Sequence, residues 1–372
     1  MKTISLSILF SVLLRAGFTQ SIPAESLYLG QTPPGTTPKV FNIDYQSGYV
    51  ITERIAISRD DKEIYYAEGT PPTHWMIRHF TYANDAWSES SLLFDNYTGP
   101  ALSPGDDTLF FHKYYNTSSW LSNIYFSVRD GSGWSTPSVF AGDISMGWLQ
   151  MTDAGDFYVT RQDGSLGVSK MVISDSDTVF HSMGIGNREF FISRDESFII
   201  FSSDGGGGFG RNDLFVSYRR NDATWTDPVN LGSTINTSNW DVSPYVTPDE
   251  KYLFYVRVNT SGGRALYWVK ADELIDSLRI ASGVADVKGF SSGQDIIIYP
   301  NPSNGQFNII LGEVPYRVAM VEVCDLEGRL ILSSAIHNKT RATIDLSGHA
   351  RGVYLVKLVI DGEIVNRKIF MD

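Results

Sequence analysis

The chain reads Tyr245-Val246-Thr247-Pro248-Asp249-Glu250-Lys251-Tyr252-Leu253-Phe254-Tyr255 two thirds of the way along its length. This stretch is an apolar pair, a hydroxyl residue, a short acidic turn and an aromatic strand. Four earlier stretches have the same order and begin at residues 55, 101, 149 and 191. Each copy predicts a strand, a tight turn and a second strand, because Ser, Thr and Asp side chains can hydrogen-bond the backbone of a turn.

The spacing of the copies predicts a propeller. From Ser58 to Ser103, Thr152, Ser193 and Thr247 the steps are 45, 49, 41 and 54 residues. A blade of four antiparallel strands takes about 40–50 residues, so the sequence predicts an all-β, five-bladed β-propeller, with six blades as the alternative. The segment 40–50 either adds a strand to the last blade and closes the ring or belongs to a sixth, degenerate blade. An acidic start and apolar positions 274, 275 and 278 then predict a short helix over 271–278.

Several tryptophans occupy one slot of the repeat. Trp87, Trp134 and Trp225 each begin an expected outer strand. We expect them to pack between neighbouring blades rather than to stack on a ligand.

Composition excludes several classes of protein. The 372 residues include 33 Gly, 19 Tyr, 21 Phe and 8 Trp, which is typical of strands and turns. The net charge of −12 argues against a nucleic-acid partner, because such binding depends on Lys and Arg that neutralise phosphates. The single cysteine, Cys324, allows neither an intramolecular disulfide nor a cysteine metal cluster, and we interpret it as a core residue.

The N-terminus predicts export. Lys2, the apolar run Ile4–Leu14 and the small residues Ala16 and Gly17 form a signal peptide over residues 1–19, with cleavage at or shortly before Ser21. This apolar run is shorter than the ~20 residues that a membrane-spanning helix needs. No later segment is apolar enough, so we expect no transmembrane segment.

The repeat region resembles the Pro-Asp type of propeller repeat found in TolB-like periplasmic proteins. The strongest stretch contains Phe201-Ser202-Ser203-Asp204, the Gly205–Gly210 run, Asn212–Ser217, Trp225 and Pro228-Val229-Asn230-Leu231-Gly232. Tyr28–Phe41 resembles the opening segment of such proteins from Bacteroidota. The turns depart from that family's usual Pro-Asp-Gly and read Arg-Asp-Asp, Pro-Gly-Asp, Asp-Ala-Gly, Arg-Asp-Glu and Pro-Asp-Glu. The resemblance covers about residues 25–280.

The C-terminal segment resembles a second family, the C-terminal sorting domain of type IX secretion. The opening is Ile296-Ile297-Ile298-Tyr299-Pro300-Asn301-Pro302-Ser303-Asn304-Gly305-Gln306-Phe307, and Val321–Leu330, Thr343–Ser347, Ala350–Lys357 and Asn366–Ile369 follow in order. Its strands and Gly and Asp turns predict a small β-sandwich. The ending, Phe370-Met371-Asp372, departs from the family's more usual Lys-then-apolar end.

Together these features predict four parts. They are a signal peptide at 1–19, a propeller at 20–280, a Gly- and Ser-rich linker at 281–294 and a sorting domain at 295–372. The second resemblance implies that the type IX machinery is a partner, and that the protein is secreted or attached to the outer cell surface, outside the outer membrane.

The sequence contains no His-Glu-x-x-His motif, and we expect no cofactor. Its Gly-x-Ser-x-Gly match, Gly289-Phe290-Ser291-Ser292-Gly293, lies in the Gly- and Ser-rich linker and not between an expected strand and helix, so we do not interpret it as a nucleophile elbow. Oxygen ligands in the Gly-rich stretch, Asp204, Asn212 and Asp213, allow a calcium site, but a flexible hairpin with polar ends is the favoured interpretation. Propeller glycosidases use two axial carboxylates. The possible pairs here, drawn from Asp60, Asp106, Asp195 and Asp241, are mostly explained as turn residues.

We therefore predict a non-catalytic module that binds a glycan, peptide or protein through loops and the axial mouth. A secreted propeller-type hydrolase and a structural surface component are the alternatives. The candidate ligand contacts are the tryptophans outside the regular slot, namely Trp240 first, then Trp148, Trp120 and Trp75.

Overall fold

The computed structural model describes residues 22–371 apart from gaps at 119–120, 132, 142–145, 163–165, 174–177, 186–188, 206–207, 221, 283, 285–296, 300–302, 311–318, 326–328, 337–340 and 361–362. The predicted signal peptide, Trp120 and most of the predicted linker lie outside the described residues. The chain divides into two compact units, Met1–Val284 and Ala285–Asp372, which we describe separately.

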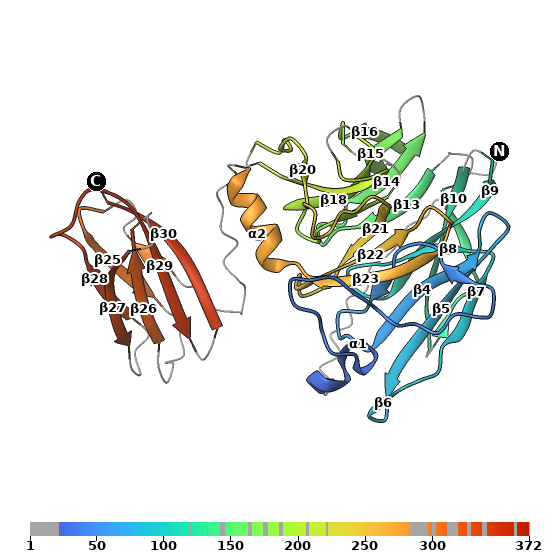
Figure 1. The fold of residues 1–372 in the computed structure, drawn as a ribbon, viewed down its shortest axis with the longest axis horizontal. Helices are drawn as coiled ribbons and strands as arrows, with labels where there is room; N and C mark the ends of the chain where they lie inside the picture. The colour runs from blue at the N-terminus through green and yellow to red at the C-terminus, as the bar shows by residue number, and fades with distance from the viewer. Residues whose placement is uncertain are drawn as a thin grey trace. The chain divides into compact units, whose positions relative to one another are not determined.

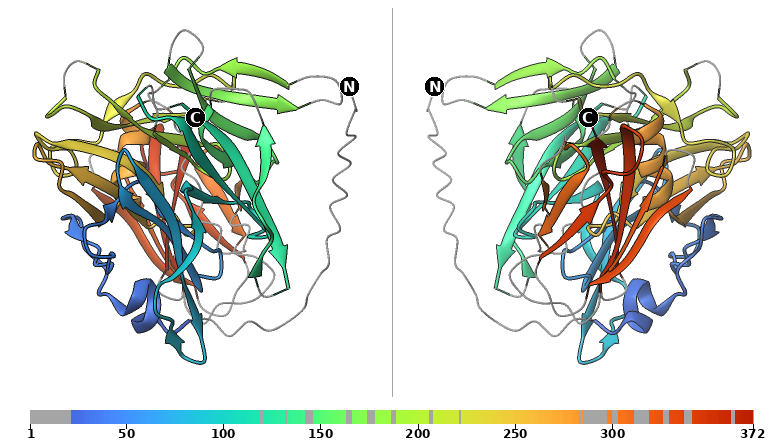
Figure 2. Two further views of the ribbon diagram at one scale, coloured as in Figure 1. Left: turned by 90° about the vertical axis from the view of Figure 1, so that its right-hand side faces the viewer. Right: turned by 90° about the vertical axis from the view of Figure 1, so that its left-hand side faces the viewer.

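Five antiparallel sheets form the first unit in its described residues, and they follow one another along the chain (Figures 1 and 2). Sheet 1 contains β2 (Val50–Ile51), β3 (Ala56–Ile57), β4 (Glu63–Thr70), β5 (His74–Ala83), β6 (Ala86–Trp87) and β7 (Ser91–Asp95). Sheet 2 contains β8 (Thr98–Leu102), β9 (Thr108–Asn116), β10 (Leu121–Asp130), β11 (Gly133–Trp134) and β12 (Ser138–Ala141). Sheet 3 contains β13 (Met146–Met151), β14 (Phe157–Gln162), β15 (Leu166–Ile173) and β16 (Thr178–Ser182).

The last two sheets complete this unit. Sheet 4 contains β17 (Phe190–Ile192), β18 (Phe198–Ser203), β19 (Asp213–Tyr218) and β20 (Val229–Asn230). Sheet 5 contains β21 (Trp240–Val246), β22 (Tyr252–Val258), β23 (Arg264–Lys270) and β1 (Lys39–Val40). The short turns η1 (Ala24–Ser26) and α1 (Leu27–Gly30) precede sheet 5's β1, and helix α2 (Asp272–Ala281) follows β23. The unit is an all-β propeller, and each sheet contains one copy of the sequence repeat.

The first and last sheets are joined by contacts between distant parts of the chain. Strand β1 pairs antiparallel with β23, with Lys39 opposite Trp268, so the N-terminal segment supplies the outer strand of sheet 5. On the inner side, the Tyr245 hydroxyl accepts a hydrogen bond from the Ile57 amide (2.9 Å) and donates one to the Ile57 carbonyl (3.1 Å). Of the segment 40–50, Val40 is thus added to the last sheet, whereas Val50, in β2, pairs with Gly69 of sheet 1.

Each repeat turn is held by its own hydroxyl residue. In the first copy the Ser58 hydroxyl donates to Asp60 (2.8 Å) and accepts from the Glu63 amide (2.9 Å). The fourth and fifth copies repeat both bonds from Ser193 and Thr247. Three residues after the hydroxyl residue, every copy has a positive φ, at Asp61, Asp106, Gly155, Glu196 and Glu250. Local side-chain bonds therefore offset a backbone conformation that non-glycine residues seldom adopt.

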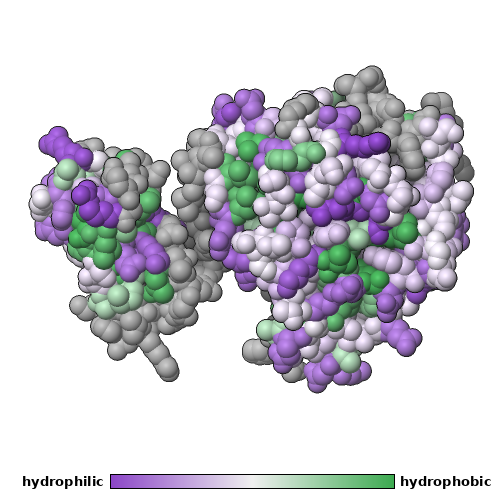
Figure 3. Space-filling view, viewed as in Figure 1, coloured by the Kyte–Doolittle hydropathy of each residue, from purple (hydrophilic) through white to green (hydrophobic). Residues whose placement is uncertain are grey.

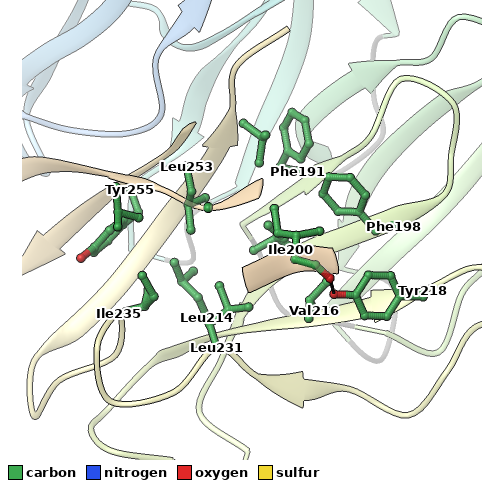
Figure 4. Close-up of a cluster of buried hydrophobic side chains, with 14 residues drawn as sticks. Phe191, Phe198, Ile200, Leu214, Val216, Tyr218, Leu231, Ile235, Leu253 and Tyr255 are labelled. Carbon is green, nitrogen blue, oxygen red and sulfur yellow. Dashed lines mark hydrogen bonds between the residues drawn. The ribbon is translucent and has the colours of Figure 1, made fainter. Parts of the chain in front are cut away.

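Apolar side chains fill the space between neighbouring sheets. Figure 4 shows one such cluster, in which Phe191 and Ile200 of sheet 4 face Leu253 of sheet 5. Helix α2 covers the cluster, and the Tyr218 hydroxyl donates to the Ile275 carbonyl at 2.5 Å. Full burial of each such side chain stabilises the fold by about 1.5–3 kcal/mol. Polar and weakly polar residues cover most of the visible face of this unit (Figure 3).

Each of the three outer-strand tryptophans packs on a core that two sheets share. Trp134 of sheet 2 donates from Nε1 to the Tyr65 hydroxyl of sheet 1 (3.2 Å), as predicted. Trp225 packs at the edge of the core formed by sheets 3 and 4. Trp87 packs on the core of sheets 1 and 5 and also donates to the Ser26 carbonyl of the N-terminal segment at 2.7 Å.

The second unit is a sandwich of two small sheets. One contains β24 (Ile297–Tyr299), β25 (Gln306–Ile310) and β28 (Arg341–Asp345), and the other contains β26 (Ala319–Cys324), β27 (Leu330–Ile336), β29 (Gly352–Ile360) and β30 (Glu363–Met371). Phe307, Val323 and Val356 lie in its core. Cys324 is only half-buried, at the edge of this core.

Candidate functional site

The propeller axis is the first place to search for a site, because equivalent positions of the five repeats meet there. The residues four positions before each turn hydroxyl residue are Arg54, Gly99, Trp148, Glu189 and Ser243. The turns obey one pattern, whereas this position carries a different residue in every copy. A purely structural role shared by all five copies would not require that variety.

Arg54 crosses the axis and closes it. Its guanidinium donates to the carbonyls of Leu149 in sheet 3 (2.5 Å) and Phe190 in sheet 4 (3.2 Å), and it lies 5.6 Å from the ring centre of Trp148. Only 2% of Arg54 is exposed. Burial lowers the pKa of its guanidinium to about 10, so the group keeps its charge at neutral pH.

On the turn side of Arg54 the axis holds a small cavity. Arg54, Gln150, Phe191 and Tyr245 are among the residues that line it, and its volume is about 40 Å³. Ligand pockets for small molecules have volumes of roughly 300–1,000 Å³. The space accommodates a few water molecules and is too small for a sugar ring.

A buried polar cluster lies near Arg54. Glu53 accepts a hydrogen bond from the Tyr114 hydroxyl (2.9 Å), and its other carboxylate oxygen lies 3.3 Å from His112 Nε2. The His112 ring is stacked on Trp148, with 6.0 Å between ring centres. Glu53 and His112 are both buried, so this cluster presents no open surface.

A more accessible group of residues lies where the Gly-rich loop of sheet 4 meets sheet 5. The Arg211 guanidinium lies over the Trp240 ring, 4.4 Å from its centre. Arg211 is exposed, Trp240 is half-buried, and Phe209 is 50% exposed two residues before Arg211. We call Phe209, Arg211 and Trp240 the Trp240 platform.

The loop that carries the platform is anchored in three ways. The buried Asp213 carboxylate accepts hydrogen bonds from the Phe209 amide (2.6 Å) and the Gly210 amide (3.2 Å). A Cβ atom at Gly210 would overlap the carbonyl oxygen of Thr237, so only glycine allows the loop to approach so closely. The Asn212 carbonyl accepts from the Asp241 amide at 2.9 Å, which ties the loop to the start of β21. These contacts hold Arg211 against Trp240.

The platform differs from the other two arginine–tryptophan stacks of the described structure. Arg54, on Trp148, donates to two carbonyls. Arg129, on Trp134, forms an ion pair with Glu63. The Arg211 side chain forms neither a hydrogen bond nor an ion pair with any described residue, so its charge is available to a ligand.

The structure places the other sequence-predicted contacts elsewhere. Trp148 is 4% exposed beneath Arg54, and Trp75 is 7% exposed and packs on Tyr114 with 4.9 Å between ring centres, so neither offers a free face to a ligand. Of the three predicted contacts that the structure describes, only Trp240 lies in an accessible group. Sequence reasoning missed Phe209 and Arg211, although an aromatic and a basic residue inside a run of glycines could have indicated them.

Of the oxygen ligands proposed for calcium, Asp213 is already engaged in hydrogen bonds. Asp213 is occupied by the loop amides and by the Asn230 amide group (2.8 Å), while Asp204 is exposed at the start of the loop. Within the described residues, no three His, Cys, Asp or Glu side chains are arranged to hold a metal ion.

The four candidate catalytic carboxylates have structural partners. Asp60 and Asp195 accept from their turn serines. Asp106 accepts from the Arg59 amide (2.7 Å), which belongs to the neighbouring repeat turn. Asp241 is fully buried and forms an ion pair with Arg257 at 2.7 Å.

Comparison with known proteins identifies the second unit. Residues 297–372 match the family described as the secretion system C-terminal sorting domain, and this segment belongs to it. The chain is therefore an exported protein that type IX secretion delivers to the cell surface or the surroundings. No curated protein matches the chain. In its described residues, no helix is long and apolar enough to cross a membrane.

Solved propeller-type structures are similar to the chain at a distance. TolB from Acinetobacter baumannii is 14% identical, with a TM-score of 0.39 over 58% of this chain and 53% of that one. PorZ, an essential surface component of the type IX secretion system of Porphyromonas gingivalis, is 14% identical, with a TM-score of 0.33 over 86% and 59%. The chain thus spans between half and three fifths of the length of these two proteins. Such distant similarity indicates no activity for this chain.

Proposed function

We propose that this protein is a non-catalytic binding module that acts outside the outer membrane and holds a glycan, peptide or protein on the Trp240 platform. The observation that carries the proposal is the Arg211 guanidinium, which is stacked on Trp240 and has neither a hydrogen-bond nor an ion-pair partner among the described residues. In this proposal residues 1–19 are the signal peptide that starts export, and the sorting domain brings the propeller to the type IX machinery.

The closed axis supports binding over hydrolysis. A propeller glycosidase needs two carboxylates that face an open pocket about 5–9.5 Å apart. Here Arg54 spans the axis, and the cavity beside it measures about 40 Å³. A surface platform is therefore the better-supported place for a ligand than the axis.

The test is a glycan and peptide array probed with the full chain and with the variant Trp240→Ala. We expect a ligand that the full chain retains and that the variant loses. Lys39→Gln is the control, because Lys39 is exposed on β1, the outermost strand of sheet 5, whereas Trp240 begins β21 on its inner side. Hydrolysis of a polysaccharide panel without retained ligand would overturn the proposal.

A further inference from the structure

We infer that the Trp240 platform recognises a carboxylate-bearing sugar, such as a uronic acid residue of an acidic polysaccharide. This inference rests on the proposed function and narrows it to one class of ligand. Three observations carry it: an arginine without an acidic partner, an aromatic ring fixed beside it, and a polar rather than apolar rim.

The positive charge of Arg211 favours an anionic ligand. The chain has an excess of acidic residues and a net charge of −12, yet no described acid pairs with Arg211. The acidic residues next to Arg211 and Trp240 in the sequence are already engaged, Asp213 with the loop amides and Asp241 with Arg257. A guanidinium binds a carboxylate through two parallel hydrogen bonds, and stacking on Trp240 holds its plane in a fixed orientation for that geometry.

The rim of the platform favours a sugar over a peptide. Asn212 and Asn239 are half-buried and Ser238 is exposed, and all three lie on the segments that hold the platform. Their side chains can exchange hydrogen bonds with the hydroxyl groups of a sugar ring. Two common modes of peptide recognition use a groove with apolar pockets or an open sheet edge, and acidic peptide motifs are usually bound by a cluster of arginines, whereas the platform has Arg211 alone. At this position β21 is paired with β22 on one side, with Trp240 opposite Val258, and is bridged to Asn212 of the Gly-rich loop on the other, so neither edge of the strand is open at Trp240.

The platform is already organised for binding. Asp213 and Gly210 fix the loop, and the Arg211 amide donates to the Asn239 carbonyl at 3.3 Å. A ligand that meets a fixed site does not bear the entropy cost of ordering it. The exposed half of Phe209 then provides an apolar surface beside the carboxylate-binding group.

The experiment measures binding of the full chain to oligogalacturonate, oligomannuronate and hyaluronan fragments by calorimetry, each beside its carboxyl-reduced, neutral counterpart. We expect at least one acidic oligomer to bind. Its neutral counterpart should bind with roughly tenfold to a hundredfold lower affinity, because it cannot form the charge-assisted pair. Arg211→Gln should lower the affinity for the acidic oligomer by a similar factor and leave the affinity for the neutral oligomer unchanged. The affinity of Arg211→Lys for the acidic oligomer should lie between those of the native protein and Arg211→Gln. Lysine keeps the positive charge but cannot form the two parallel hydrogen bonds of a guanidinium.

Two controls make the outcome decisive. Lys39→Gln removes one positive charge elsewhere in the same unit and should leave binding unchanged. Tryptophan fluorescence of each variant must show the native melting transition, so that lost binding is not lost folding. Equal binding of acidic and neutral oligomers, or of native protein and Arg211→Gln, would refute the inference, and so would binding of none of the three acids.

The two proposals fail in different ways. If the array yields a neutral glycan or a peptide that requires Trp240, the inference is wrong and the proposed binding function stands. If no ligand depends on Trp240, both are wrong.

Discussion

The Tyr245 hydroxyl is the group whose removal tests most directly how the propeller is closed. It forms both of its hydrogen bonds with the backbone of Ile57, and these bonds join sheet 5 to sheet 1. The substitution Tyr245→Phe removes one oxygen and keeps the ring. It leaves the Ile57 amide and carbonyl without this partner in a fully buried position.

The structure sets the size of the effect. A buried backbone group that loses its hydrogen-bond partner lowers the free energy of unfolding by about 1–3 kcal/mol. In Tyr245→Phe two groups, the Ile57 amide and the Ile57 carbonyl, lose their partner. Phenylalanine has no hydroxyl group to remove from water on folding, and this gain offsets part of the loss. We therefore expect Tyr245→Phe to lower the free energy of unfolding by about 2–4 kcal/mol. For a unit of this size that corresponds to a fall in melting temperature of roughly 5–15 °C.

Tryptophan fluorescence during urea unfolding measures this change in one unit alone, because all eight tryptophans lie between residues 75 and 268. The matched control is Tyr82→Phe, since the Tyr82 hydroxyl is buried and has no hydrogen-bond partner in the described structure. Its removal should be neutral or slightly stabilising. A loss below about 0.5 kcal/mol in Tyr245→Phe, or equal losses in the two variants, would show that these bonds do not hold the first and last sheets together.

Three further predictions concern stability and binding. Burial raises the pKa of the Asp61 and Asp106 carboxyls to about 6, above the ~4 of an unfolded chain, so the folded state loses stability as the pH rises from about 4 to about 6 and bears the full cost above pH 6. The double variant Asp61→Asn/Asp106→Asn should therefore be more stable than native at neutral pH in urea titrations, and its advantage should shrink as the pH falls from 6 to 4; a constant difference would contradict this. Gly99→Ala places a Cβ 2.5 Å from the buried His112 ring at a φ of 67°, and we expect a loss of at least about 2 kcal/mol by the same assay. Gly210→Ala should weaken ligand binding roughly tenfold or more with an almost unchanged melting temperature, because it displaces the platform loop and not the core; retained affinity would show that the loop's position is unimportant.

The fold could be predicted from the sequence because its turns depend on hydrogen bonds between residues that are close together in the chain. The turn bonds of Ser58, Ser193 and Thr247 connect residues at most five positions apart, so their pattern survives as a visible repeat. Alternating apolar strands beside those turns then indicate the sheets. The sorting domain was recognisable for the same reason, since its turn residues and strands follow a fixed order.

The site was only partly predictable because burial and pairing are decided between distant segments. Trp148 and Trp240 both lie outside the regular tryptophan slot of the repeat, so the sequence does not distinguish them. In the structure Arg54, from another sheet, covers Trp148, whereas Trp240 stays accessible. That Arg211 lacks a polar partner depends on Asp213 and Asp241 being engaged elsewhere, which no sequence spacing reveals. The pairing of β1 with β23 likewise joins residues more than 200 positions apart, which no local sequence pattern indicates.

That pairing sets the order in which the molecule can be completed. Strand β1 and its partner β23 lie near opposite ends of the propeller sequence, so the outer edge of sheet 5 stays open until β23 has been synthesised. At roughly 5–20 residues per second, the wait between the two strands is about ten seconds to just under a minute. Throughout that interval sheet 5 cannot be completed, because the partner of β1 does not yet exist.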